Sequence, residues 1–106
     1  MGIEEKIMNF VNPFPGRKPG DTLTKREIIS ALRMALCAEE EAIHLYDMIA
    51  EFVNDEDVKK IMTDIADEEQ IHVGEIQKLL KEKSDDETEM LDKGEGEVVD
   101  KIAAEL

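Results

Sequence analysis

Apolar residues recur along this chain at intervals of three and four, the spacing that gathers them on one side of an α-helix. One stripe follows Leu32, Ala35, Glu39, Ala42, Tyr46, Ile49 and Val53, and it is called the inner stripe below. A second stripe follows Val58, Met62, Ile65, Glu69, His72, Ile76 and Leu79. The pattern therefore predicts two long helices, each with one polar interruption on an otherwise apolar face.

The boundaries of these helices have local signals. Thr24 and Glu27 match a capping box, which places the start of the first helix near Lys25. The acidic stretch 54–57 predicts a short turn and a new N-cap, and the second helix should then run to about Glu82. Because a short turn makes neighbouring helices antiparallel, we expect an all-α fold: a two-helix hairpin that dimerises into a four-helix bundle.

The segments outside the hairpin differ in composition. Residues 3–11 predict a short amphipathic helix, and three Pro and two Gly within 12–20 predict an extended arm. Residues 81–106 hold ten acids and four Lys, which predicts a partly disordered tail with a short helix over 98–104. The predicted parts are an N-terminal arm (1–22), a helical hairpin (23–83) and an acidic C-terminal tail or short helix (84–106).

Composition narrows the classes of function. In a chain of 106 residues a lone hairpin buries a thin core, so we expect association between copies. The formal net charge of −14 argues against nucleic-acid binding and suits the attraction of cations, although acidic surfaces also serve solubility alone. The single cysteine, Cys37, excludes an internal disulfide and a CxxC metal pair. We expect no signal peptide and no membrane span, which fits a cytoplasmic protein.

Three titratable residues lie on the two apolar stripes and indicate a functional site. Glu39 is about as far before the predicted turn as the midpoint of Glu69 and His72 is after it, so all three should project into one layer of the interface. Di-iron carboxylate proteins take one Glu from each of two helices and a Glu-x-x-His from each of the other two. This chain supplies half of that set, and two copies would complete it. Mixed oxygen and nitrogen donors suit iron, and also manganese or zinc.

Each of these residues also has a plain structural interpretation. Glu39 and Glu69 would then sit at a solvated edge of the hairpin, with His72 as an interface residue. Tyr46 either hydrogen-bonds a ligand and donates an electron, or is a core aromatic with a wet hydroxyl. Cys37 is expected to serve packing.

The stretches Ala38–Tyr46 and Asp67–Glu75 resemble the encapsulated ferritins of the ferritin-like superfamily, in particular the archaeal form. The resemblance implies a ferroxidase that oxidises Fe(II) with dioxygen at a di-iron site between two subunits. It implies that Glu69 bridges the irons, that Glu39 and His72 are terminal ligands, and that Tyr46 lies beside them. Glu41 would be an acid that guides metal inward, whereas Ala38 stands where some relatives have a second such acid.

The resemblance further implies partners and a location. Homodimers would form a ring, typically a decamer, inside an encapsulin nanocompartment whose shell protein stores the iron mineral. Two rival functions stay open: a rubrerythrin-like peroxide reductase and a non-catalytic helical dimerisation module.

Overall fold

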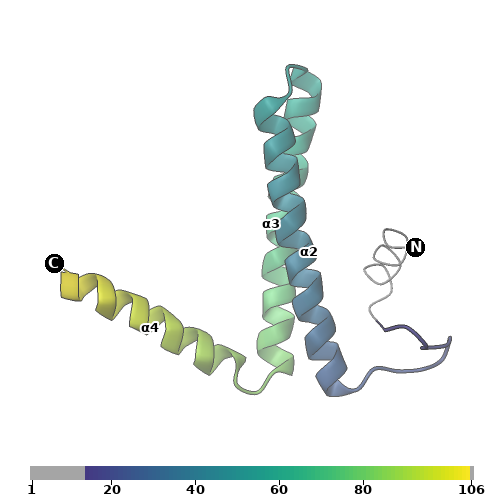
Figure 1. Ribbon diagram of the computed structural model, residues 1–106, viewed down its shortest axis with the longest axis vertical. Coiled ribbons are helices and arrows are strands. Elements are labelled where there is room, and N and C mark those ends of the chain that lie inside the picture. Colours follow the sequence, from purple (N-terminus) through teal and green to yellow (C-terminus); the bar gives the residue numbers. More distant parts are fainter. Residues whose placement is uncertain (1–13, 106) are drawn as a thin grey trace.

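Three α-helices make up the part of the chain that the computed structural model describes, residues 14–105. They are α2 (Lys25–Phe52), α3 (Glu56–Lys83) and α4 (Glu87–Glu105), and the described residues contain no strand (Figure 1). The all-α prediction is confirmed. The predicted helix at 3–11 lies outside the described residues.

Helix α2 begins where the capping box predicts. The Thr24 hydroxyl accepts a hydrogen bond from the Glu27 backbone N–H at 3.2 Å, and Glu27 Oε1 accepts one from the Thr24 N–H at 3.0 Å. The Arg17 guanidinium also pairs with Glu27 and ties the arm to the first turn of α2. The Thr24 N–H foremost, and Arg17 after it, hold the pKa of the Glu27 carboxyl below its ordinary value.

Replacing Thr24 with Ala should destabilise the protein, because an N-cap side chain satisfies a backbone N–H that the helix leaves unpaired. We expect a loss of about 1 kcal/mol in the free energy of unfolding, which lowers the melting temperature by about 4–8 °C for a domain of this size. Thermal unfolding followed by circular dichroism measures the shift. Thr22→Ala, at an exposed position two residues earlier, is the control and should unfold like the wild type.

The turn between α2 and α3 is held by a second cap. Asp55 accepts hydrogen bonds from the backbone N–H groups of Asp57 at 2.9 Å and Val58 at 3.1 Å. The first turn of α3 is acidic and its last turn carries Lys81 and Lys83, so both ends complement the helix dipole. The short turn therefore folds α3 back along α2.

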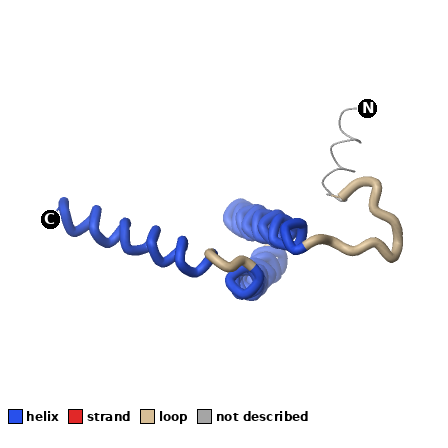
Figure 2. Tube along the Cα trace, turned by 90° about the horizontal axis from the view of Figure 1, so that it is seen from below, coloured by secondary structure: helices blue, strands red, loops and turns tan. Residues whose placement is uncertain are grey.

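The hairpin is a pair of side-by-side antiparallel helices (Figure 2) with a thin core. All seven residues of the inner stripe are half-buried, as the apolar pattern predicts. Among the described apolar residues only Ala66 and Leu80 are fully buried, while many large ones stay exposed. One hairpin therefore leaves much apolar surface in water, which favours association with another chain.

Helix α4 leaves the open end of the hairpin and points away from it (Figure 1). Two ion pairs fix its start against α2: Arg33 with Glu87 at 2.7 Å and Lys25 with Asp85 at 3.4 Å. The helix runs through Gly94 and Gly96, so it is longer and more continuous than the predicted tail. Glu89 and Lys93, like Glu97 and Lys101, are four residues apart in the sequence, a spacing that favours a helix.

Candidate metal centre

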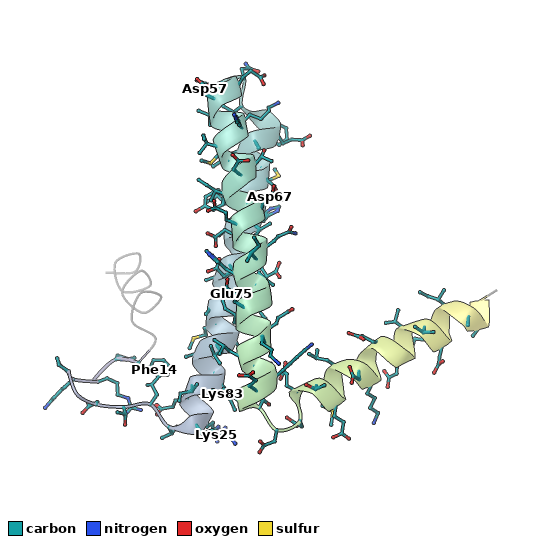
Figure 3. The ribbon with its side chains drawn as sticks, turned by 180° about the vertical axis from the view of Figure 1, so that it is seen from behind. Phe14, Lys25, Asp57, Asp67, Glu75 and Lys83 are labelled. Carbon is teal, nitrogen blue, oxygen red and sulfur yellow. The ribbon has the colours of Figure 1, made fainter. Side chains whose placement is uncertain are left out.

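Glu39 of α2 and the Glu69–His72 pair of α3 bring their side chains together midway along the hairpin. One ligand atom from each residue lies within 4.8 Å of the other two. The labelled residues Asp57, Asp67, Glu75 and Lys83 mark the course of α3 through this level (Figure 3). Because both helices run straight from the turn, residues equally distant from it meet, and the predicted convergence is present in the structure.

The distances within the group are short enough for all three side chains to share one cation. His72 Nδ1 lies 3.5 Å from Glu69 Oε2 and 3.8 Å from Glu39 Oε2. The side chains of Glu39 and Glu69 are 24% and 20% exposed, whereas that of His72 is 48% exposed. The carboxylates thus lie between the helices and the imidazole marks the open side, from which a second chain could add ligands.

The strongest sign of a missing ligand is one oxygen of Glu39. Oε2 of this side chain is buried and has no hydrogen-bond partner among the described residues. A buried carboxylate oxygen without a hydrogen bond is costly, since burial removes its water, and His72 Nδ1 at 3.8 Å is too distant to replace that hydrogen bond. A cation beside it would remove that cost. The donor set of two carboxylates and one imidazole therefore fits iron, manganese or zinc.

The other predicted site residues are outside this group. Tyr46 is half-buried on the inner stripe, two turns beyond Glu39, and Glu41 is exposed on α2. His44 and Cys37 are exposed as well. The structure thus joins three of the five predicted residues, and the roles of Tyr46 and Glu41 stay predictions.

A second apolar stripe on α2 is a feature that our reading of the sequence missed. Its larger members are Met34, Leu45, Met48 and Phe52, which are 42%, 55%, 43% and 75% exposed. The signal was available, because these residues also follow a spacing of three and four. Among the described helices, none combines the length and the apolar character that crossing a membrane needs.

Three comparisons with known proteins agree on the kind of protein that this chain is similar to. The rubrerythrin family model matches residues 13–104. The crystal structure of the encapsulated ferritin domain from Pyrococcus furiosus superposes with a TM-score of 0.75 and 38% identity, over 82% of this chain and 87% of that one. A ferritin-like-encapsulin shell fusion protein from the same organism is 49% identical over 57 residues. That match covers 54% of this chain and 16% of the fusion protein.

Proposed function

This chain belongs to the encapsulated ferritins, within the ferritin-like superfamily that includes the rubrerythrins, and on that premise we propose that it is a ferroxidase. Its substrate is Fe(II), bound as a pair at a site that two copies of the chain complete. Each Fe(II) gives up one electron, and dioxygen accepts the electrons. The alternative of a dimerisation module without redox chemistry leaves the converging ligands unexplained.

The observation that carries this proposal is the convergence of Glu39, Glu69 and His72 around an unpartnered carboxylate oxygen. Three donors from one chain are half of the four-Glu, two-His set of di-iron carboxylate proteins. A two-fold axis beside the exposed His72 edge would supply the other half. Carboxylates favour the ferric product because hard oxygen donors stabilise the more highly charged ion.

Each residue has a distinct role in this proposal. Glu69 bridges the two irons, and Glu39 and His72 each hold one of them. Glu41, exposed on the same helix as Glu39, draws Fe(II) toward the site by its charge. Tyr46 lies on the inner stripe, where its hydroxyl serves the ligands by hydrogen bonding or electron donation.

The proposed assembly and location of this chain are inferred from its relatives. We infer a homodimer that is repeated in a decameric ring, within an encapsulin compartment that receives the oxidised iron. The fusion of a ferritin-like domain to an encapsulin shell in the Pyrococcus furiosus protein supports this inference. The match covers 16% of that fusion protein, so an association of this chain with an encapsulin shell is part of the proposal.

A peroxide reductase is the second candidate, because the matching family model is that of rubrerythrin. Both activities use the same ligands and differ in the oxidant. Stopped-flow oxidation of the Fe(II)-loaded protein by dioxygen and by hydrogen peroxide separates them. We expect dioxygen to oxidise the bound iron rapidly, and a reaction with peroxide alone would favour the rubrerythrin-like activity.

Anaerobic titration with Fe(II) should show saturation at about one iron per chain, since two copies share two irons. Equilibrium binding and mass photometry of the same samples give the metal count and the oligomeric state together. Saturation at about two irons per chain would mean a complete site within one chain, and absence of binding would favour the dimerisation module. Either outcome contradicts the shared site.

A further inference from the structure

Helix α4 is attached to the hairpin around its first residue. The side chain of Glu87 is 12% exposed, whereas residues 88–104 are all exposed and the helix points away from the hairpin (Figure 1). A lone helix of this length is marginal in water, and Gly94 and Gly96 weaken it further. Packing along α4 therefore does not set its direction within one chain, and the contacts around Glu87 are left to do so.

Some of these contacts lie within residues 84–86, the turn between α3 and α4, which we call the elbow. Ser84 is 7% exposed, and its backbone N–H donates a hydrogen bond to the Leu80 carbonyl at 2.9 Å. The Ser84 hydroxyl donates to Asp86 Oδ1 at 3.1 Å, and its carbonyl accepts from the Glu87 N–H at 3.4 Å. These bonds end α3 and begin α4, but none of them joins the elbow to α2. They leave the direction of α4 relative to α2 to other contacts.

Two ion pairs supply the connection to α2, and they differ in burial. Arg33 Nη2 lies 2.7 Å from Glu87 Oε1, and the Glu87 side chain is nearly buried. Lys25 Nζ lies 3.4 Å from Asp85 Oδ2, and these side chains are 65% and 92% exposed. Water and salt screen an exposed pair, so it contributes little, whereas a short hydrogen bond between charged groups contributes more. The two ion pairs therefore do not contribute equally.

The position of Glu87 on α4 also relates it to the apolar side of that helix. Leu91, Val98 and Ile102 are 43%, 56% and 58% exposed, and they follow each other at helical spacing. At 100° per residue Glu87 lies within roughly 60° of all three around the helix axis. Whatever holds Glu87 against α2 therefore also decides which way this apolar side faces.

We propose that the Arg33–Glu87 ion pair is a latch that holds α4 in its outward direction. Within one chain it joins the start of α4 to α2, and without it the elbow becomes a hinge. The direction of α4 and of its apolar side is thus set before any other chain is met. The proposal does not involve the metal centre, so it stands or fails independently of the proposed ferroxidase.

A distance measurement between spin labels tests the latch. In a Cys37→Ala background, labels at Ile61→Cys on α3 and Ile102→Cys on α4 occupy positions that are 50% and 58% exposed. Because fifteen residues separate Glu87 from Ile102, a tilt of α4 by about 30° moves the second label by about 12 Å. Pulsed electron paramagnetic resonance of the full chain with Zn²⁺ in place of iron measures the distance distribution. Dilution with unlabelled chain confines the measured distance to one copy.

The latch predicts a specific pattern among the variants. Arg33→Gln and Glu87→Gln should each turn one narrow distance peak into a broad distribution, and the double variant should be no broader than either, because one interaction is lost in all three. The two single substitutions change the net charge in opposite directions, so overall charge does not explain a shared effect. Lys25→Gln removes the exposed ion pair and is the matched control, which should keep the narrow peak. Circular dichroism checks that each variant keeps its helices.

Three results would overturn the latch. A narrow, unshifted peak in Arg33→Gln and Glu87→Gln would mean that the elbow or a neighbouring chain holds α4. A double variant broader than both single variants would mean that Arg33 and Glu87 act separately. Equal broadening in Lys25→Gln would assign the effect to charge at this end of the hairpin instead of to the Arg33–Glu87 pair.

Discussion

Fe(II) oxidation should fall by about 100-fold or more when Glu69 is replaced with Gln, because the substitution removes a charged ligand from the proposed site. Glu69 is 20% exposed and lies between the helices, so the isosteric amide preserves the packing while it abolishes the negative charge. The initial rate of Fe(III) formation in air-saturated buffer, followed by absorbance, measures the effect. In the proposed dimer one substitution alters both halves of the site, which makes the expected loss large.

Glu68→Gln is the matched control for this experiment. Glu68 is the preceding residue on α3, has the same chemistry and is exposed. It should retain the oxidation rate of the wild type within about two-fold, as expected for a surface substitution away from the ligands. If both variants oxidise Fe(II) at the wild-type rate, Glu69 is not a metal ligand. An equal loss of rate in both would indicate a general effect of negative charge on oxidation instead of metal ligation.

Metal binding should also stabilise the fold strongly. A ligand that binds only the folded protein contributes about 2.7 kcal/mol at a concentration 100-fold above its dissociation constant. For a domain of this size that corresponds to a rise of about 10–20 °C in melting temperature. The gain is expected because metal satisfies the buried Glu39 oxygen and links two thin cores. Thermal unfolding with Zn²⁺ or Mn²⁺, which avoid iron oxidation during the scan, measures the shift.

The two histidines of the chain provide the test and its control. His72→Ala should lose most of the metal-dependent rise, because the imidazole lies 3.5 Å from Glu69 Oε2. His44→Ala removes an exposed imidazole outside the converging group and should keep the full rise. The reverse result would place the metal on the other side of α2 and contradict the assignment.

Much of the hairpin was predictable because its signals are local. The capping box at Thr24 and the acidic turn before α3 each act over a few residues, so both helix starts could be placed from sequence. The convergence of Glu39 with Glu69 and His72 was also predictable. It needs only the position of one turn and the constant rise of two straight helices, and an error of two residues moves a side chain only about 3 Å.

The course of the C-terminal segment was less predictable. Its acids and glycines predicted a tail with a short helix, whereas α4 is one helix of 19 residues. At the start of α4, Glu87 and Asp85 pair with Arg33 and Lys25, which lie more than fifty residues earlier and come close only in the folded hairpin. Contacts of this kind carry no periodic signal along the chain.

The sequence by itself determined that two amphipathic helices would form and that Glu39, Glu69 and His72 would share one level, because capping and helical period depend on neighbouring residues alone. Only the tertiary structure decided which side of α2 is covered. Both the inner stripe and the second apolar stripe of α2, which holds Met34, Leu45, Met48 and Phe52, have the period of a helix contact. Packing against α3 half-buries the first and leaves these residues of the second exposed. The tertiary structure also decided that one oxygen of Glu39 is buried without a hydrogen-bond partner, since burial depends on side chains that approach from a different helix.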